Sequence, residues 1–367
     1  MFSFGIEHEV AFVDRAGNFV DFSCAKFTDF DQIVEKLPRY SSDYPQLRVG
    51  DAQIKDKRWY IEGFERFADS EEVLECVPKG IEIRTTINSS IESAINELSE
   101  SFKLLSEVAA EFGFTPVLTS FNPYHSEFKP NPPLNEYEIN RRKVSPEKQT
   151  ANIPMLTYGP DLNISATDLS VEQVIDIGQK LTYYSPYIIP FSYSSPFYQG
   201  KLWEGLSVRT FVRTGPRPAT MVFVENKEEL IKSSPSLTKI ARIPAEVGRI
   251  EFKACDSCGD FSIYAGILAL LKGLVLDTSL SGRALTPDPK LHQLSAQVGF
   301  DDQKIYDFAS SILQAAETAL SNDPDAKFLA ILKTYLEKRQ TPAHELIGLF
   351  HNTGSIQEAI NRSYKNH

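Results

Sequence analysis

Apolar and polar residues alternate with a period of two in several short stretches of this chain. The first such stretch, GIEHEVAFVD at 5–14, sets Glu7 and Glu9 two positions apart in an otherwise apolar run. Side chains at i and i+2 of a strand point to the same face, so the pattern predicts a strand over 4–13 with its two carboxylates side by side. Further strands are predicted over 80–86, 155–165, 206–213, 220–224 and 249–255.

Four of these later stretches also carry two polar residues, two positions apart, on one face and apolar residues on the other. A sheet with one face in water would produce such alternation in any single strand. A solvated face usually mixes Thr, Ser and Lys, whereas here Glu begins three of the five pairs. We therefore expect one face of the sheet to line a cavity while helices cover the other. The later pairs are Glu82 and Arg84, Asp161 and Asn163, Ser207 and Arg209, and Glu251 and Lys253.

A helical period of three and four residues is strongest over 90–112, where Ser90 can cap the helix N-terminus and Gly113 its C-terminus. A second helix is expected to begin at Ser170, with Gln173 completing a capping box, and to end before Pro186. The first helix should pack on the outer face of the sheet through Ile95, Leu98, Phe102 and Leu105.

The remaining helices are predicted in the second half of the chain. One runs from about 260 to 279, and the part from about 301 onward reads as mainly helical. No internal repeat or long linker divides the chain. The pattern predicts one mixed domain over 1–367, with helices packed outside a sheet.

Composition narrows the choice of partners. The chain has 367 residues, of which 42% are hydrophobic and 24% charged, as in an ordinary globular protein. Its 38 basic and 49 acidic residues give a net charge of −11, which argues against nucleic acid or an anionic membrane as the main partner. The apolar run 263–276 is interrupted by Lys272 and predicts a buried helix. Only four cysteines occur and the N-terminus lacks a secretory pattern, so we expect a cytoplasmic protein.

Several common chemistries leave no trace in the sequence. There is no Walker A loop, no Gly-x-Gly-x-x-Gly after a strand, and no recognisable Ser-His-Asp or Cys-His motif. The Cys255–Cys258 pair has no partner pair and is predicted to be two small residues at a strand-to-helix turn. The basic, aromatic run 55–66 is expected to form a surface hairpin or an active-site flap. Phosphate would have to be bound by side chains and metal.

The charge pattern suits a specific ligand. Carboxylates on three strands would face three cationic side chains, and Mg²⁺ with polyphosphate needs that combination of hard oxygen ligands and neutralising Arg or Lys. The cation between Glu7 and Glu9 is therefore interpreted as Mg²⁺.

Four segments together resemble the glutamate–cysteine ligase type 2 family, the carboxylate–amine ligases, in order and approximate spacing. The resemblance covers the chain from about Phe4 to Leu276. It implies an α+β fold similar to glutamine synthetase: a curved, largely antiparallel sheet forming a funnel-like active site, with helices packed outside. ATP and two or three Mg²⁺ are expected inside this funnel. It also implies that ATP phosphorylates the glutamate side chain and that an amine displaces the phosphate. The segments are GIEHEVAFVD, GIEIRTTINSSIESA, SPFYQGKLWEGLSVRT and RIEFKACD.

The resemblance implies roles for individual side chains. The family's metal-binding glutamates match Glu7, Glu9, Glu82 and Glu251. The expected catalytic cations are Arg209, Lys253 and Arg84, and the expected ATP-binding side chains are Arg209, Lys253 and Asn163.

Three positions depart from the family pattern. Lys253 stands where many members have arginine, which keeps the charge but loses the bidentate fork. Asp161 and Asn163 stand where many members have a His-x-His strand, so the polar lining differs and the acid and amine substrates are open.

The predicted function is an ATP- and Mg²⁺-dependent ligase that joins glutamate and cysteine. The alternatives are a carboxylate–amine ligase with another acid or amine, a more distant phosphotransferase of the same superfold, and a non-catalytic nucleotide- or amino-acid-binding relative. The four glutamates argue against a simple binding protein, because such a protein has little reason to keep so much mutually repelling charge. The expected partners are amino acids and ATP, with no nucleic acid or membrane; a homo-oligomer is left open.

Overall fold

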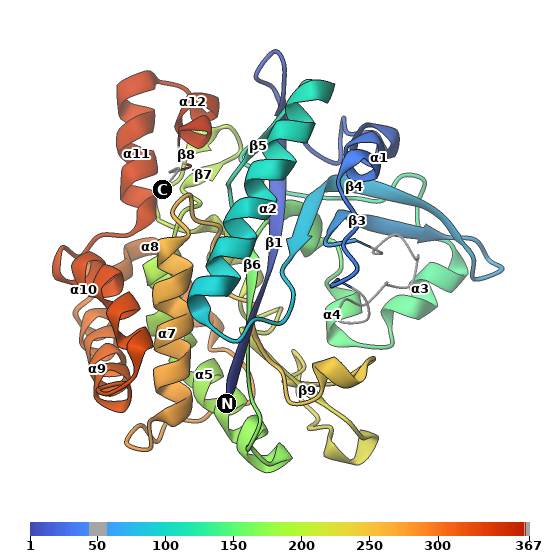
Figure 1. Ribbon diagram of the computed structural model, residues 1–367. Helices are drawn as coiled ribbons and strands as arrows, with labels where there is room; N and C mark the ends of the chain where they lie inside the picture. Colours follow the sequence, from blue (N-terminus) through green and yellow to red (C-terminus); the bar gives the residue numbers. More distant parts are fainter. Residues whose placement is uncertain (44–56, 363, 365–367) are drawn as a thin grey trace.

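A computed structural model describes residues 1–43, 57–362 and 364 (Figure 1). Residues 55 and 56 of the predicted hairpin, and the other positions of 1–367 outside these ranges, lie beyond the described residues. The strands are β1 Phe2–Asp14, β2 Phe19–Val20, β3 Trp59–Phe67, β4 Val73–Arg84, β5 Phe114–Val117, β6 Pro160–Ala166, β7 Phe197–Tyr198, β8 Lys201–Leu202, β9 Thr220–Val224, β10 Thr238–Ile240 and β11 Ile250–Phe252. The helices are α1 Phe27–Lys36, α2 Ile91–Phe112, α3 Glu136–Arg142, α4 Pro146–Gln149, α5 Val171–Ile188, α6 Val208–Arg213, α7 Ser262–Leu276, α8 Pro289–Val298, α9 Gln303–Ala319, α10 Leu329–Glu337, α11 Pro342–Thr353 and α12 Ile356–Asn361.

One curled sheet organises the molecule, with strand order β10-β9-β11-β6-β1-β4-β3 and with β2 and β5 also paired to β1. All pairs in it are antiparallel except β10 with β9, which confirms the predicted largely antiparallel sheet. The long strand β1 lies between β4 and β6, so that Glu7 is opposite both Arg84 and Asp161. On the next strand across, Glu251 of β11 is opposite Asn163. The polar pairs predicted on separate strands therefore lie side by side.

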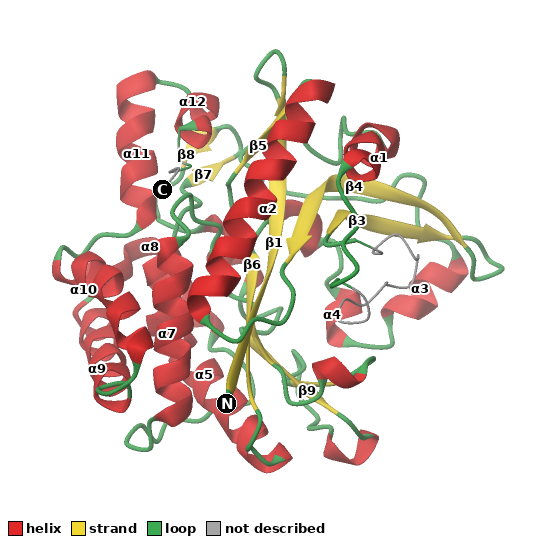
Figure 2. Cartoon of the chain, viewed as in Figure 1, coloured by secondary structure: helices red, strands yellow, loops and turns green. Residues whose placement is uncertain are grey.

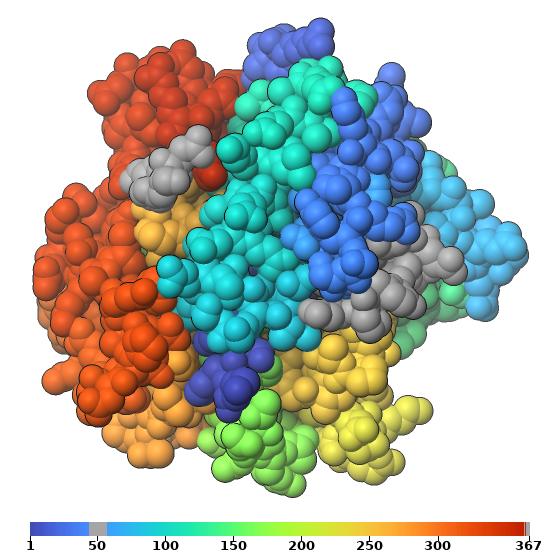
Figure 3. All heavy atoms as spheres, in the orientation of Figure 1, coloured from blue at the N-terminus to red at the C-terminus, as the bar shows by residue number. Residues whose placement is uncertain are grey.

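Helix α2 covers the other face of the sheet. It crosses in front of β1 in Figure 1, and its atoms form a continuous band in Figure 3. Leu98, Phe102 and Leu105 are buried in the core beneath it, while Ile95 is partly buried against the same core. The Ser90 side chain accepts a hydrogen bond from the Ser93 backbone, and Gly113 has a φ of 84°, the left-handed conformation that favours glycine. The predicted bounds and packing of this helix are confirmed.

Helix α5 continues past the proline at which it was predicted to end. The capping box of Ser170 and Gln173 is present at its start. Pro186 lies inside the helix and cannot donate to the carbonyl of Thr182, four residues earlier. The Ser185 hydroxyl donates to that carbonyl instead, at 2.7 Å. A side chain thus replaces the missing backbone hydrogen bond, which the sequence pattern did not indicate.

The second half of the chain supplies a helical layer, seen in red beside the yellow strands in Figure 2. Helix α7 is buried along most of its length, as the apolar run predicted. It contacts both α9 and α10. A Cβ added to Gly273 would lie 2.5 Å from the Cβ of Ala316, so glycine permits the close approach of α7 and α9. Within the part of the chain that the structure describes, no helix has both the length and the hydropathy to cross a bilayer.

The prediction of a strand over 206–213 is wrong, because Val208–Arg213 form helix α6. Its β-branched residues favour a strand, but the Ser207 hydroxyl accepts a hydrogen bond from the Thr210 backbone at 3.0 Å and begins a helical turn. The change matters for the site, because Arg209 and Arg213 are four residues apart and share one face of a helix.

A buried histidine predicts how stability depends on pH. His292 is fully buried, with Nδ1 at 2.7 Å from the Asp288 carbonyl, and burial lowers its pKa from 6.5 to about 4. Between these values the unfolded chain binds a proton that the folded chain does not, so stability falls as the pH falls. Urea unfolding at pH 7 and pH 5 should show a loss of about 2 kcal/mol from this group. The His292→Gln protein should lose correspondingly less; an equal loss in both proteins would contradict the assignment.

Candidate active site

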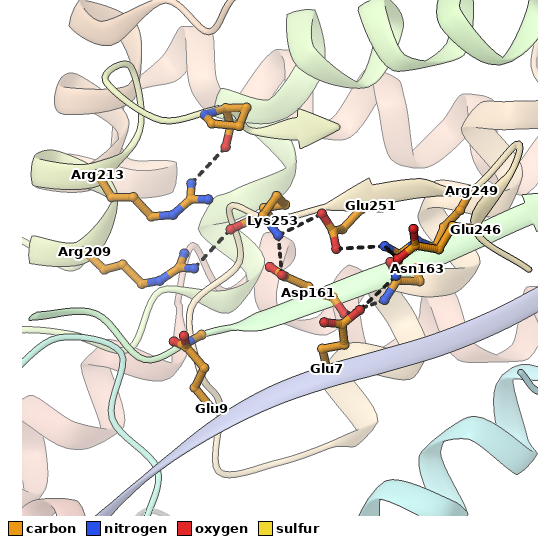
Figure 4. Close-up of polar contacts among 12 residues, drawn as sticks. Glu7, Glu9, Asp161, Asn163, Arg209, Arg213, Glu246, Arg249, Glu251 and Lys253 are labelled. Carbon is orange, nitrogen blue, oxygen red and sulfur yellow. Dashed lines mark hydrogen bonds and ion pairs between the residues drawn. The ribbon is translucent and has the colours of Figure 1, made fainter. Parts of the chain in front are cut away.

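The charged face of the sheet lines a cavity of about 340 Å³. Its walls come from β1, β4, β6, β11 and helix α6, and every sequence-predicted site residue lies on them. Figure 4 shows Glu7 and Glu9 projecting from one side of β1 toward the side chains of the facing elements. The period-two pattern thus placed these groups on the correct face.

A first group of carboxylates consists of Glu7, Asp161 and Glu251, one from each of β1, β6 and β11. A ligand oxygen from each lies within 4.8 Å of the others. Two cations interleave with them (Figure 4): Lys253 pairs with Asp161 and, at 2.8 Å, with Glu251, while Arg249 lies 2.8 Å from Glu7 and 3.6 Å from Glu251. We call these three acidic residues the first carboxylate group.

Electrostatics holds the cations of this group in their charged forms. Burial lowers the pKa of Lys253, but Asp161 and Glu251 more than offset this effect and the pKa is raised. Burial and the neighbouring carboxylates also raise the pKa of Asp161, with Lys253 acting in the opposite direction. The pKa of Arg249 is raised by Glu251 and Glu7 against the effect of burial. Three carboxylates and two fixed cations leave the group net negative.

A second carboxylate group consists of Glu9, Glu62 and Glu82, with ligand oxygens again within 4.8 Å of one another. The fully buried Lys79 donates to Glu9 at 2.8 Å and to the carbonyl oxygens of Pro154 and Thr157, each at 2.6 Å. The other oxygen of Glu9 accepts from the Gly159 backbone at 3.0 Å. The orientation of Glu9 is therefore set by two contacts, one from Lys79 of β4 and one from the backbone just before β6.

The four glutamates expected to bind the metal ions fall into two groups in the structure. Glu7 and Glu9 belong to different groups, Glu251 joins the first and Glu82 the second. The positive partner of each β1 glutamate is a protein side chain, Arg249 for Glu7 and Lys79 for Glu9. The reason is geometric: strands on the two flanks of β1 contribute separately, because β6 and β11 lie on one side and β4 and β3 on the other.

Three arginines of and after α6 line the same cavity: Arg209, Arg213 and Arg217. Their guanidinium groups donate to backbone carbonyls, as in Arg209 to Ala254 at 2.9 Å and Arg213 to Pro218 at 2.9 Å. Burial and the neighbouring arginines lower the pKa of Arg213 well below its ordinary value. Among the described residues none of the three forms an ion pair with a carboxylate, so this wall of the cavity presents positive charge to a ligand.

The two other predicted site residues also lie on the cavity wall. Arg84 is buried opposite Glu7; it donates to the Lys57 carbonyl at 2.7 Å and lies over the ring of Tyr60. Asn163 is buried beside Glu251, and its Oδ1 has no hydrogen-bond partner within the described residues. A buried amide oxygen without a donor is suited to accept a hydrogen bond from a ligand.

The sequence prediction did not assign several of these groups. Arg249 precedes Glu251 by two residues, so the same spacing rule could have found it. Arg213 and Arg217 follow Arg209 at intervals of four and become visible once the segment is recognised as helical. Lys79 had no local signal, since only its burial beside Glu9 reveals its role. Glu62 lies in the run 55–66 that was predicted as a surface hairpin or an active-site flap, and the pairing of β3 with β4 places it in the second carboxylate group.

The Cys255–Cys258 pair has the environment of structural residues. Both side chains are fully buried, no disulfide joins them, and burial raises the pKa of Cys255 to about 12. A thiol with so high a pKa is a poor nucleophile at neutral pH. The geometry agrees with their assignment as small residues between β11 and α7.

Three solved structures share this fold. The chain superposes on a bifunctional glutathione synthetase from Pasteurella multocida with a TM-score of 0.60 at 11% identity, covering 98% of this chain and 51% of that one. It is similar to a glutamate–cysteine ligase from Francisella tularensis, in complex with AMP, with a TM-score of 0.57 at 13% identity over 98% and 86% of the two chains. The ligase PafA with its partner Pup gives 0.51 at 11% identity over 98% and 72%. The chain thus shares its fold with these three enzymes.

The family follows from the sequence comparison. Residues 3–215 match the model of glutamate-cysteine ligase family 2, and the chain belongs to that family. Two relatives carry the name "Putative glutamate--cysteine ligase 2". The one from Jannaschia sp. (strain CCS1) is 26% identical over 218 residues, and the one from Paracoccus denitrificans (strain Pd 1222) is 23% identical over 205. The matches span 56% and 52% of this chain and only 56% and 53% of the relatives.

Proposed function

We propose that this chain is an ATP- and Mg²⁺-dependent carboxylate–amine ligase that forms a γ-glutamyl amide, with glutamate and cysteine as its substrates. The observation that carries the proposal is one cavity in which two groups of three carboxylates lie opposite three arginines without a carboxylate partner. A triphosphate with bound divalent cations has the complementary distribution of charge. Membership of glutamate-cysteine ligase family 2 supports the same chemistry.

The carboxylate groups fit Mg²⁺ by the chemistry of their donors. Every ligand atom in both groups is a carboxylate oxygen, which is the donor that hard Mg²⁺ prefers. Glu7, Asp161 and Glu251 would hold one ion and Glu9, Glu62 and Glu82 another. When bound, Mg²⁺ would neutralise charge on the phosphates of ATP. Asp161, which stands in the strand that departs from the family pattern, is thereby proposed as a metal ligand.

Arginine and lysine side chains of this chain are proposed to stabilise the negative charge that shifts as the γ-phosphoryl group is transferred. The γ-phosphoryl group passes from ATP to the side-chain carboxylate of glutamate, the amine then attacks the acyl carbon, and an amide, ADP and phosphate result. Arg209 of α6 donates to the carbonyl of Lys253 at 3.0 Å, and both residues line the cavity, where they can bind the transferring phosphoryl oxygens. Being already oriented, they stabilise the transition state better than water can. Arg84 and Asn163 would position the substrates.

The test is a screen of amino-acid pairs with ATP and Mg²⁺, in which ADP, AMP and the amide product are measured. ADP and amide should form only when an acid and an amine are both present, with the highest rate for glutamate and cysteine. If another pair gave the highest rate, the chain would still be a carboxylate–amine ligase, but with substrates other than glutamate and cysteine. AMP with pyrophosphate would contradict an acyl phosphate, and a thermal shift with ATP but no turnover with any pair would indicate a binding protein.

A further inference from the structure

A buried carboxylate that belongs to neither carboxylate group lies directly behind the cavity wall. Asp256 is fully buried in the loop that follows β11. Among the described residues no Lys or Arg lies within ion-pair distance of it. Burial accordingly raises the pKa of Asp256, while Arg209 and the hydrogen-bond donors around it act in the opposite direction. Burying an acid in this way is costly unless its hydrogen bonds are well made.

The bonds of Asp256 converge on the start of helix α6. Its Oδ2 accepts from the Ser194 backbone at 2.9 Å and from the Ser195 hydroxyl at 2.8 Å, and its Oδ1 accepts from the Ser207 hydroxyl at 3.0 Å. Ser207 is the N-cap residue of α6, and its oxygen accepts from the Thr210 backbone at 3.0 Å. The Ser195 oxygen lies 3.3 Å from the backbone nitrogen of Arg209, which donates to it.

The loop that carries Asp256 also holds the other end of Arg209. The two terminal nitrogens of the guanidinium group donate to the carbonyls of Ala254 at 2.9 Å and Lys253 at 3.0 Å. Gly159 faces this guanidinium group, and a Cβ there would collide with it. The arginine is therefore fixed at its backbone through Asp256 and at its tip through the residues just before Asp256.

We propose that Asp256 is a positioning residue that sets helix α6, and with it Arg209, in register with the carboxylates of β11. Two elements that are remote in sequence carry the opposite charges of the cavity, and one acid joins them through two serine hydroxyls. The inference rests on the proposed function for its effect on turnover, but the placement of α6 can be measured without any reaction.

The chain offers a matched set of variants. Asp256→Asn is nearly isosteric, but it removes the negative charge. If the amide oxygen keeps accepting from Ser194 and Ser195, the NH2 faces Ser207 and can only donate, so the charge-assisted hydrogen bond donated by Ser207 is lost. Ser195→Ala and Ser207→Ala each remove one of the two linking hydroxyls. Ser194→Ala is the control: this serine is adjacent and similarly buried, but its hydroxyl donates to the Ser257 carbonyl at 2.6 Å and it bonds Asp256 only through its backbone.

Hydrogen exchange of the intact protein tests the placement directly. In Asp256→Asn the backbone amides of 208–213 should exchange at least about tenfold faster than in the wild type, with smaller increases in the Ser195 and Ser207 variants and none in Ser194→Ala. The amides of α2 should be unchanged, which separates a local effect from general unfolding. Unchanged exchange in α6 of Asp256→Asn and of both serine variants would overturn the proposal.

Turnover tests whether the positioning acts through Arg209. Asp256→Asn should lower ADP formation by about 10–100-fold, as loss of a supporting residue does at other charged sites. In an Arg209→Lys background the same change should cost less than about threefold, because the group being positioned is already altered. Equal costs in both backgrounds, or a wild-type rate in Asp256→Asn, would overturn the catalytic role. If the wild type forms no ADP with any pair, the proposed function fails and the exchange measurement alone decides.

Discussion

Glu251→Gln is expected to lower the rate of ADP formation on the order of 10³-fold, the largest effect of any single change considered. Glu251 is the buried member of the first carboxylate group, and it contacts both cations of that group, Lys253 at 2.8 Å and Arg249 at 3.6 Å. Glutamine keeps the shape of the side chain but removes the negative charge that a divalent cation requires. The affinity for Mg²⁺, measured by titration calorimetry, should fall together with the rate.

The fold of the Glu251→Gln protein should be preserved, because the replacement is nearly isosteric and removes one of three mutually repelling charges. Glu246→Gln is the matched control: Glu246 lies 3.5 Å from the same Arg249 but belongs to neither carboxylate group. It should retain most activity. A wild-type rate in Glu251→Gln would mean that β11 has only a structural role and that the chemistry lies elsewhere.

Arg209→Ala is expected to lower turnover by on the order of 10²-fold or more, with Mg²⁺ binding largely retained. The side chain is buried in the cavity wall and pairs with no carboxylate among the described residues, so its loss should leave both carboxylate groups in place. The missing interaction is made most strongly as the phosphoryl group transfers, and kcat should therefore fall more than the affinity for ATP.

Two further variants test how the effect of Arg209→Ala is to be interpreted. Arg209→Lys should recover part of the rate, because the charge returns without the planar fork that grips two oxygens. Arg283→Ala is the control for loss of an arginine, since Arg283 pairs with Asp176 on an exposed surface remote from the cavity lining. If Arg209→Ala loses Mg²⁺ binding to the same extent as Glu251→Gln, the arginine supports the metal sites and does not act on the transferring group.

Local periodicity was sufficient to predict the elements whose pattern follows from the geometry of the strand or helix itself. The alternation around Glu7 and Glu9 predicted β1 and the face of its carboxylates, because the side chains of a strand alternate whatever it pairs with. The stripe and caps of α2 predicted that helix for a similar reason. Helix α6 was mistaken for a strand because its β-branched residues were outweighed by the Ser207 cap, which a residue 49 positions away in the chain, Asp256, holds in place.

The sequence by itself determined several strands of the sheet, the helix that covers it, and the charged character of the remaining face, since these depend on spacing within single elements. The antiparallel arrangement was expected from the resemblance to a known family. Only the tertiary structure decided how the carboxylates of this face are divided between two groups. It separated Glu7 from Glu9 by placing β6 and β11 on one flank of β1 and β4 and β3 on the other, so that each β1 glutamate acquired its own group and its own cation. Carboxylates interact over a few ångströms of space, and strand order sets those distances in ways that no local pattern records.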